Sequence, residues 1–513
     1  MSGGKDRRLC LVAFDLGAEN GRAVLGRFDG RRLELEEVYR FANEPVAASG
    51  RLYWDVLRLL LEIERGLVAA RRAAGGPLQS LAIDTWGVSF ALFDQKGELA
   101  GHPYHYRDRY VEGIMEKAFA VVPARTLFEW TGIQLMPINT LYLLLSMKLE
   151  QSAQLASARH LLMMPAALSY LLSGEMVDEF TIASTSQMVD PHTRTWSGKV
   201  LDAFGFPRDL FASVLQPGTL VGRLTPEIAE ELGVEPVPVA LTAGHDTASA
   251  VVAVPAEPSD RASGRTWAFI SSGTWSLVGL ELSRPVISDA AFEGNLSNEG
   301  GAFGTFRFLK NVMGLWLLQE CRRRWAREGA DVSYDQLVRE AAAAPPRRCF
   351  IDPDDPGFLR PGDLVSGIRE FCARTGQPAP ESRGEVARTI LESLALKYRW
   401  VVEQLERAAG VAIDRIHVVG GGSRNELLCQ LTADVTGRPV VAGPAEATAA
   451  GNLLVQAVAL RELSGLEELR SVVRTSFRTR LYEPAAGGGW EDAYRRFLSA
   501  AMGQPVREKP GSP

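Results

Sequence analysis

The sequence has few of the features that mark secreted or membrane proteins. Its 513 residues include only five cysteines, an odd number, and no two of them show C-x-x-C spacing. A disulfide framework and a structural zinc site are therefore not expected, and a reducing, cytoplasmic compartment fits the composition. No stretch approaches the roughly 20 apolar residues of a membrane span. The N-terminal segment also lacks the apolar core of a signal peptide.

Several common catalytic signatures are missing as well. The chain has no G-x-x-x-x-G-K-[ST] loop, no G-x-G-x-x-G turn and no H-E-x-x-H pair. Its formal net charge of −6 does not suit a nucleic-acid binder. With 46% hydrophobic and 23% charged residues, it has the composition of an ordinary globular protein. Any phosphate site must therefore be built from another kind of turn.

Apolar, β-prone segments alternate with helical patterns, which predicts an α/β fold. The N-terminal region contains strands joined by tight turns, followed by a helix whose apolar residues recur at helical spacing. Asp55 is the expected N-cap of this helix, and Gly75 the expected stop. The expected strands cover residues 9–14, 22–28, 33–39 and 78–83.

The opening pattern recurs after a polar, Pro/Ser-containing segment at residues 255–264, which is the best candidate for a linker. A strand, a polar glycine turn and a second strand are expected again, followed by helices that end at glycines. This recurrence suggests two related halves. The expected elements are strands at 267–270, 275–280, 413–419 and 439–441, and helices at 386–409 and 425–436.

The chain length predicts two domains. We place the first at residues 1–255 and the second at 265–482, with a helical tail and a disordered end within 483–513. Residues 104–242 look more irregular, with helical stretches among many loop residues. We interpret them as insertions on the first domain that shape a substrate cleft.

Two polar turns are candidates for binding phosphate. The run Asp15-Leu16-Gly17-Ala18-Glu19-Asn20-Gly21-Arg22 joins two strands, and its glycines allow successive N–H groups to face an anion. Asp15, at a strand end, is placed to hold Mg²⁺ through water. A plain β-hairpin is the alternative. The run Ser271-Ser272-Gly273-Thr274 repeats the device in the second half, so that two turns would hold a triphosphate.

Asp246 is the candidate general base. The run Gly244-His245-Asp246-Thr247 begins as a turn and continues into a helix of small residues. A carboxylate at this helix N-terminus either caps the helix or accepts the proton of an attacking hydroxyl group. The helix N-terminus would keep it ionised.

Two further glycine-containing turns favour ligand contacts. Gly420-Gly421-Gly422 lies between a strand and a helix, where a flat ring can approach the bare backbone, although a tight turn is the alternative. Trp86-Gly87 follows a strand and suits a sugar, since it offers an aromatic face beside a backbone without a side chain. A core tryptophan is the alternative for Trp86.

Together these residues resemble the FGGY carbohydrate kinases, which belong to the actin and hexokinase ATPase class. The resemblance runs from about residue 9 to about residue 481, and LKNVMGLWLLQ and AIDTWGV are specific to the branch that acts on L-rhamnulose. The Gly-rich turns alone would indicate only an actin-like ATPase. The matching strings are DLGAENGR, GRLYWDV, AIDTWGVSF, TGIQLMPINTLY, AGHDTASA, SSGTWSL, NEGG, LKNVMGLWLLQ, VVGGGSRN and AGPAEAT.

The resemblance implies two actin-like (ribonuclease H-like) α/β domains with an ATP cleft between them, the first carrying the sugar site and the second the nucleotide site. It implies transfer of the γ-phosphoryl group of ATP to L-rhamnulose, giving L-rhamnulose 1-phosphate, with Mg²⁺ as cofactor and Asp246 as proton acceptor. The implied sugar contacts are Gly87, His245, Asp246, Thr247 and Asn311, and the implied nucleotide contacts are Ala18, Glu19, Asn20, Gly21, Arg22, Thr274, Gln319 and Gly421.

One position departs from the family pattern, which often has small hydroxyl residues where Glu19 and Asn20 stand. A carboxylate beside a triphosphate repels it. Either the Glu19 side chain points away and only its N–H binds, or the turn acts less directly.

Two other functions remain open from the sequence. A kinase for another ketose, such as L-fuculose or L-xylulose, would use the same motifs. An ATP-driven conformational protein of the actin or Hsp70 type would not need Asp246 as a base or a sugar site at Gly87. A small-molecule ketose and ATP are the expected partners, and the sequence does not specify an oligomeric state.

Overall fold

The computed structural model describes residues 8–257, 265–359, 362–485 and 487–503. The chain divides into two compact units. Most of the expected linker, residues 258–264, and the expected disordered end lie outside the described residues. Residues 446–478 group with the first unit, although the sequence placed them in the second domain. Of the described residues, the first unit comprises 8–257, 280–309 and 446–478, and the second comprises 265–279, 310–359, 362–445, 479–485 and 487–503.

The first unit contains a six-stranded mixed sheet with the order β13-β14-β6-β1-β2-β3. β1 is antiparallel to β2 and parallel to β6, and β14 is parallel to β6. The neighbouring strands β14, β6 and β1 therefore all end at one edge of the sheet. The strands are β1 (Leu9–Leu16), β2 (Asn20–Phe28), β3 (Leu33–Ala42), β6 (Ser80–Thr85), β13 (Thr219–Arg223) and β14 (Pro238–Leu241).

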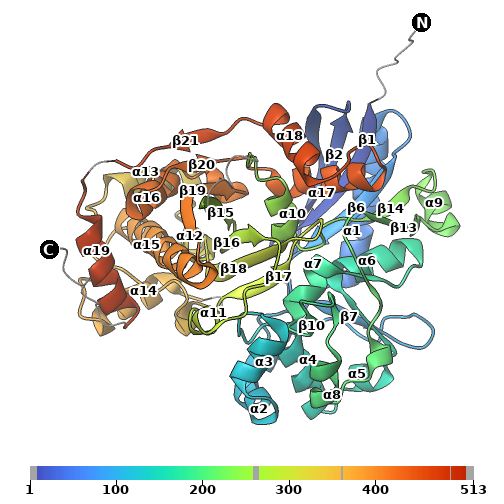
Figure 1. Ribbon diagram of the computed structural model, residues 1–513, viewed down its shortest axis with the longest axis horizontal. Helices are drawn as coiled ribbons and strands as arrows, with labels where there is room; N and C mark the ends of the chain where they lie inside the picture. Colours follow the sequence, from blue (N-terminus) through green and yellow to red (C-terminus); the bar gives the residue numbers. More distant parts are fainter. Residues whose placement is uncertain (1–7, 258–264, 360–361, 486, 504–513) are drawn as a thin grey trace, which may run out of the picture. The chain divides into compact units, whose positions relative to one another are not determined.

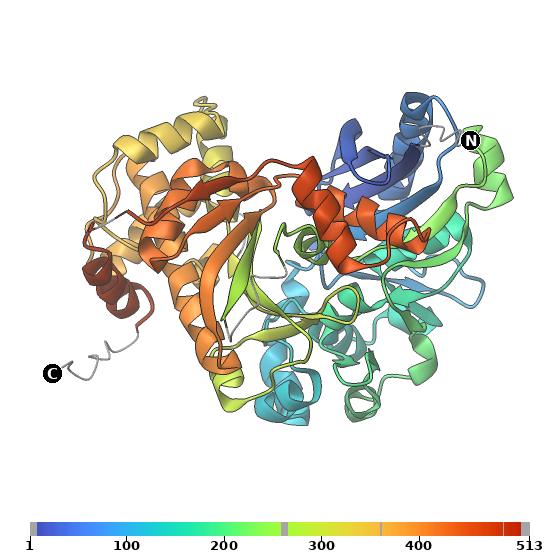
Figure 2. The same ribbon diagram turned by 45° about the horizontal axis from the view of Figure 1, so that its top comes forward.

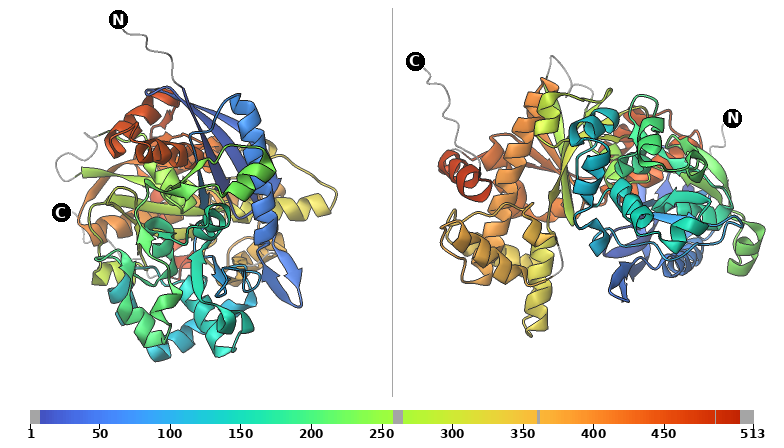
Figure 3. Two further views of the ribbon diagram at one scale, coloured as in Figure 1. Left: turned by 90° about the vertical axis from the view of Figure 1, so that its right-hand side faces the viewer. Right: turned by 90° about the horizontal axis from the view of Figure 1, so that it is seen from below.

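Helix α1 (Val56–Ala74) packs on one face of this sheet, as Figure 3 shows beside the N-terminal strands. The expected caps are confirmed: the Asp55 side chain accepts a hydrogen bond at the N-terminus, and Gly75 ends the helix with φ 64°. Gly66 brings the helix close to the sheet, because a Cβ there would lie 2.9 Å from a ring atom of Phe14.

Helices α17 (Ala447–Ala459) and α10 (Asp246–Val252) pack against each other, and α17 also packs on β1 and β6 (Figure 1). Their backbones approach closely at Gly451, where a Cβ would lie 1.9 Å from the carbonyl oxygen of Ser249. Helix α17, from late in the chain, thus packs on the sheet formed by the first part.

Residues 104–242 are more regular than the sequence suggested. They form mainly helices with a core of their own, which includes Tyr142 and Leu144. Several of these helices have only four to eight residues, too few for a period of 3.6 to be visible in the sequence. The α-helices of residues 104–242 are α2 (Ile114–Val121), α3 (Ala124–Thr131), α4 (Thr140–Leu149), α5 (Ala153–Ser157), α6 (Met164–Ser173), α7 (Phe180–Ala183), α8 (Gly198–Phe204) and α9 (Pro226–Leu232).

A second sheet has seven strands in the order β17-β18-β16-β15-β19-β20-β21. β15 is antiparallel to β16 and parallel to β19, β19 is parallel to β20, and β20 is antiparallel to β21. The strands are β15 (Arg265–Ser272), β16 (Trp275–Leu282), β17 (Ser297–Gly300), β18 (Phe306–Met313), β19 (Ala412–Val419), β20 (Val440–Ala442) and β21 (Arg480–Tyr482).

The two sheets repeat one strand pattern. In the first sheet, the parallel run β14-β6-β1 is flanked by antiparallel β13 on one side and β2 on the other. In the second, the parallel run β20-β19-β15 is flanked in the same way by β21 and β16. This correspondence supports the duplication inferred from the recurring strand, turn and strand.

The two helices expected at residues 386–409 and 425–436 are confirmed as α15 and α16 of the second unit. Helix α15 (Arg383–Ala409) begins at a capping box formed by Ser382 and Glu385 and ends at Gly410 in the left-handed conformation. It packs against α16 and β19, which are also orange in Figure 2. The other helices are α12 (Trp316–Arg327), α13 (Tyr334–Ala343), α14 (Leu364–Arg374), α16 (Glu426–Thr436) and, in the tail, α19 (Trp490–Arg496).

All five cysteines are free thiols. Within the described residues, no helix combines the length and apolar character needed to cross a membrane.

The contact between α17 and α10 gives a stability prediction. Alanine is favoured over glycine inside a helix by up to about 1 kcal/mol, but at Gly451 the new Cβ would meet backbone atoms of Ser249. We expect Gly451→Ala to lower the free energy of unfolding by about 1–3 kcal/mol, measured by denaturant unfolding. The matched control is Gly76→Ala, whose Cβ would meet nothing within 4 Å. Equal stability of the two variants would contradict the close approach.

Candidate functional site

Three aspartates lie at the carboxyl edge of the first sheet. Asp15 near the end of β1 is the register partner of Asp84 near the end of β6. Asp246 opens α10 after β14, and its turn is joined to β6 by a 2.9 Å hydrogen bond from the Thr85 N–H to the Gly244 carbonyl. Ligands of open α/β sheets bind at this edge. The sequence singled out Asp15 and Asp246 but not Asp84.

The three carboxylates influence one another. Burial raises the pKa of Asp84 well above its usual value, and the charges of Asp15 and Asp246 raise it further. Burial also raises the pKa of Asp246; Asp15 adds to this effect and His245 opposes it. This edge therefore carries a concentration of negative charge that favours a cation.

Arg22 partly balances this charge. Its Nη2 lies 2.7 Å from Asp15 Oδ2, and its Nη1 pairs with Glu446 and lies 3.7 Å from Glu37 Oε2. Burial tends to lower the pKa of Arg22, but Asp15 and Glu446 outweigh it and raise the pKa. The arginine expected beside the phosphates is thus held among carboxylates at the same sheet edge.

The turn after β1 is a hairpin. The Gly17 N–H donates to the Asn20 carbonyl at 2.9 Å, and the Glu19 carbonyl accepts from the Asn43 N–H at 3.0 Å. Gly21 lies inside β2 rather than in the turn. Its lack of a side chain has a packing cause, since a Cβ would lie 2.3 Å from the ring of Phe41. Ala18 and Glu19 form the tip.

Asp246 does not cap its helix. The N-cap residue is His245, which makes no side-chain cap hydrogen bond, and Asp246 is the first helical residue. Asp246 Oδ1 accepts from the Thr247 N–H at 2.6 Å and from Thr247 Oγ1 at 3.3 Å. Among the described residues, none forms a hydrogen bond or an ion pair with Asp246 Oδ2. One carboxylate oxygen is fixed and the other is open to a ligand.

A buried carboxylate, Glu179, holds the turn that presents Asp246. Its Oε2 accepts from the Gly244 N–H at 2.9 Å and from Thr181 Oγ1 at 2.6 Å. Thr181 Oγ1 in turn accepts from the His245 N–H at 3.2 Å. Burial raises the pKa of Glu179 to about 7, although these hydrogen bonds favour its ionised form.

His245 lies between two carboxylates. Its Nε2 is 3.4 Å from Asp246 Oδ1, and its Nδ1 is 3.4 Å from Glu299 Oε2. Arg307, which is fully buried, pairs with Glu299 at 3.2 Å. Gly87 lies beside the imidazole, since a Cβ there would be 3.2 Å from Nε2. The structure therefore brings together the predicted residues Gly87, His245 and Asp246.

Trp86 is a core residue. It is buried, its ring centroid lies 4.0 Å from that of Trp54, and its Nε1 donates to Ser89 Oγ at 2.8 Å. The alternative interpretation from the sequence, a core tryptophan, is the one that fits. Any ligand contact of this segment falls to Gly87.

The second unit brings its own predicted turns together. The turn carrying Thr274 joins β15 to β16, and the Thr274 carbonyl accepts from the Trp316 N–H, at the start of α12, at 3.1 Å. Gly422 packs on the same hairpin, because a Cβ there would lie 2.0 Å from Ser272 Oγ. Gln319 follows on α12, and Gly421 begins the short helical turn after β19.

Asn311 lies on β18, where residues from Lys310 onward belong to the second unit. The other predicted sugar contacts belong to the first unit. Asn311 therefore stays a prediction from the family resemblance.

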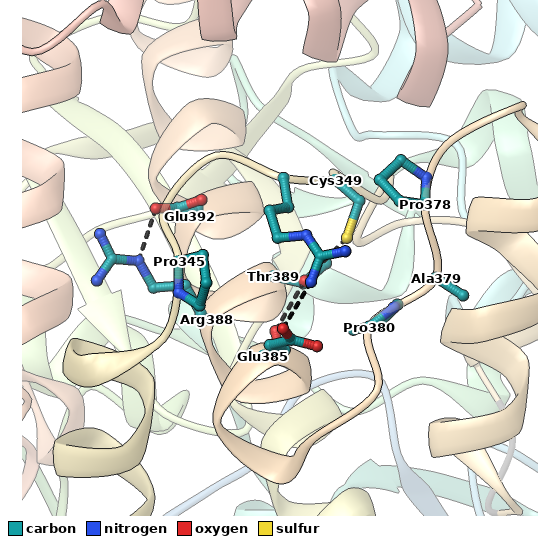
Figure 4. A pocket seen from close by; sticks show the side chains of 10 residues that line it. Pro345, Cys349, Pro378, Ala379, Pro380, Glu385, Arg388, Thr389 and Glu392 are labelled. Carbon is teal, nitrogen blue, oxygen red and sulfur yellow. Dashed lines mark hydrogen bonds and ion pairs between the residues drawn. The ribbon is translucent and has the colours of Figure 1, made fainter.

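A small pocket lies elsewhere in the second unit, against the N-terminal part of α15 (Figure 4). Its charged side chains pair with each other, Arg348 with Glu385 and Arg388 with Glu392, both at 2.6 Å. None of the predicted site residues lines it, so we assign it no role in the site.

The sheet edge fits a hard cation that keeps most of its own water. Asp15 and Asp84 offer carboxylate oxygens, the ligands that Mg²⁺ prefers. No group of three or more His, Cys, Asp or Glu side chains within the described ranges is close enough to hold a metal directly. Mg²⁺ usually binds through one or two carboxylates with several waters.

The buried state of Glu179 predicts a pH effect on stability. Because the pKa of Glu179 is raised from 4.5 to about 7 in the native state, native Glu179 between these pH values holds a proton that the unfolded chain has released. Protonated Glu179 contributes roughly 3 kcal/mol to the free energy of unfolding. This contribution is fully present below pH 4.5 and is lost as pH rises through 7. We expect Glu179→Gln to remove this loss, so that variant and wild type converge or cross in unfolding free energy between pH 4.5 and 8. Parallel curves would contradict the assignment.

The comparison with known proteins agrees with this architecture. The N-terminal domain model of the FGGY family of carbohydrate kinases matches residues 10–253, and the C-terminal domain model matches residues 268–460. Among solved structures, gluconate kinase from Lactobacillus acidophilus superposes with a TM-score of 0.77 at 16% identity, covering 97% of this chain and 99% of that one. Plasmodium falciparum glycerol kinase with ADP gives 0.74 at 13%, covering 98% and 99%.

Curated relatives are similar over nearly their full length. A rhamnulokinase from Bacteroides thetaiotaomicron is 44% identical over 95% of this chain and 98% of its own length. A rhamnulokinase from Bacillus subtilis is 38% identical over 93% of this chain and 96% of its own length. With both family models matched in order and the expected two-domain fold confirmed, this chain belongs to the FGGY family of carbohydrate kinases.

Proposed function

We propose that this enzyme transfers the γ-phosphoryl group of ATP to L-rhamnulose, giving L-rhamnulose 1-phosphate and ADP in the breakdown of L-rhamnose. The observation that carries the substrate assignment is the 38–44% identity to proteins named rhamnulokinase, over nearly the whole chain. The strings LKNVMGLWLLQ and AIDTWGV support the same branch. We place the enzyme in the cytoplasm, where thiols stay reduced.

Asp246 is the proposed general base. In phosphoryl transfer the protein supplies mainly position and charge, and a carboxylate accepts the proton of the attacking hydroxyl group. The sugar's 1-hydroxyl oxygen attacks the γ-phosphorus, its proton moves to Asp246 Oδ2, and the bond between γ-phosphorus and ADP breaks. The fixed Oδ1 and the open Oδ2 suit this role. Glu179 holds the turn in place.

Sugar and nucleotide contacts are assigned as the family resemblance implies. Gly87, His245 and Thr247 surround Asp246 and would contact the sugar, together with Asn311. We place the sugar site mainly on the first unit, where Gly87, His245, Asp246 and Thr247 lie. The proposed nucleotide contacts are Ala18, Glu19, Asn20, Gly21 and Arg22 at the first hairpin, and Thr274, Gln319 and Gly421 in the second unit.

Asp15 is the proposed magnesium residue. A Mg²⁺ ion bound there would neutralise charge on the triphosphate as it reacts. Asp15 would hold it through water, and Arg22 fixes the orientation of the Asp15 carboxylate through its 2.7 Å contact.

The substrate assignment predicts a ranking among ketoses. We expect Mg-ATP-dependent ADP release with L-rhamnulose to exceed that with L-fuculose and L-xylulose in kcat/KM. A higher kcat/KM for either competitor would overturn the substrate while leaving the family intact. ADP release that no sugar stimulates would instead favour a conformational ATPase.

The role of Asp246 predicts a separation of turnover from stability. Asparagine can accept the same hydrogen bonds from Thr247, but it cannot take a proton from the sugar. We expect Asp246→Asn to lower kcat by roughly 10²–10⁴, or roughly 3–5 kcal/mol, with the thermal midpoint unchanged or raised. Turnover within about tenfold of wild type would remove Asp246 as the base.

A further inference from the structure

Asp84 is the charged group at the sheet edge that the sequence did not single out. It is fully buried, and its Oδ2 accepts a 2.6 Å hydrogen bond from Asn452 Nδ2. Its Oδ1 is also buried and has no hydrogen-bond partner in the described part of the chain. A buried polar atom without a partner destabilises the native state, and more so when it is charged. This oxygen is therefore available to bind a ligand.

The hydrogen bond to Asp84 is the last in a chain of buried amides on α17. Gln456 Nε2 donates to the Val12 carbonyl at 2.9 Å and to Asn452 Oδ1 at 2.7 Å. Gln456 Oε1 accepts from Ser80 Oγ at 2.6 Å. These bonds fix the Gln456 amide to β1 and β6, and Gln456 in turn fixes which end of the Asn452 amide faces Asp84.

The network orients the carboxylate in one way. With Oδ2 bound by Asn452, Oδ1 is the oxygen left for a ligand, and Asp84 is the register partner of Asp15 on the adjacent parallel strand. The cluster of acidic side chains alone would not indicate a site. The buried, unpartnered Oδ1 is the independent observation that does.

We propose that Asp84 is the second carboxylate of the magnesium site that begins at Asp15, and that Asn452, oriented by Gln456, is its positioning residue. This inference rests on the proposed function, because it assigns residues to the cation that accompanies ATP. Asp84 would bind the cation directly or through a water molecule. Asn452 would not contact the cation and would only orient the Asp84 carboxylate.

The test measures binding of Mn²⁺, a spectroscopic substitute for Mg²⁺, to the full-length enzyme in the presence of ADP, with free Mn²⁺ followed by electron paramagnetic resonance. Asp84→Asn is nearly isosteric, and its side-chain oxygen can still accept from Asn452. We expect it to weaken Mn²⁺ binding by at least roughly tenfold without lowering the thermal midpoint.

The matched control is Asp178→Asn. Asp178 is also fully buried, uses one oxygen to accept from the Met163 N–H at 3.0 Å, and has its other oxygen without a partner among the described residues. The carboxylate next to it, Glu179, is already bonded to the N–H groups of Thr181 and Gly244, so we expect no cation site at Asp178. Its asparagine variant should bind Mn²⁺ as wild type does.

The positioning role has its own test. Asn452→Ala should weaken Mn²⁺ binding by roughly tenfold, and Asn452→Ser serves if the alanine variant does not fold. Because Asn452 acts through Asp84, the double variant with Asp84→Asn should bind no more weakly than Asp84→Asn alone.

The outcomes separate this inference from the proposed function. Asp84→Asn binding Mn²⁺ within about twofold of wild type, well below the effect expected for a metal-site residue, would overturn it even if wild type phosphorylates L-rhamnulose. Additive losses in the double variant would overturn the positioning role of Asn452. If wild type phosphorylates no ketose, the proposed function fails, whatever the Mn²⁺ result.

Discussion

The first unit depends on three carboxylates being tolerated at one sheet edge. Asp15 and Asp84 lie near the ends of two parallel strands and Asp246 follows a third, so the topology places them together and their charges repel. Folding alone gains nothing from this crowding, since each buried charge costs free energy unless it is paired. Arg22 compensates one of the three. The remaining negative charge favours binding of a cation together with its polyphosphate.

Buried side chains around the sheet edge form hydrogen bonds that hold Asp84 and the turn before Asp246 in place. Glu179 bonds to the backbone of the turn before Asp246, and Asn452 bonds to Asp84. Both residues are buried and lie far from their partners in the sequence. Phosphoryl transfer is sensitive to small errors in position, so side chains that only orient others matter as much as those that touch the ligands.

Local signals in the sequence were enough for the strands and turns that open each half, but they missed most helices of residues 104–242 and part of the site. Asp55 and Gly75 bound a helix through short-range capping, and the strand, turn and strand pattern recurs visibly. Asp246 stood out because its turn is a recognisable string. Asn452 could not be foreseen, because a buried amide in an apolar helix has meaning only once β6 lies beside it. The hydrogen bond between Glu179 and Gly244 likewise joins residues 65 positions apart in the sequence. Gly21 has no side chain because the Phe41 ring occupies the space beside it, and not because the turn requires a glycine.

Residues 446–478 belong to the first unit and include helix α17, which packs on one face of its sheet. During synthesis this helix cannot pack there until nearly the whole chain has been made. About 200 residues separate β14 from α17, which at roughly 5–20 residues per second is a delay on the order of tens of seconds. During that interval one apolar face of the nascent sheet lacks its helix and Asp84 lacks its amide. We therefore expect the nascent chain to expose this face of the sheet during synthesis, and a chain that ends before Ala447 to lack the helix that packs on it.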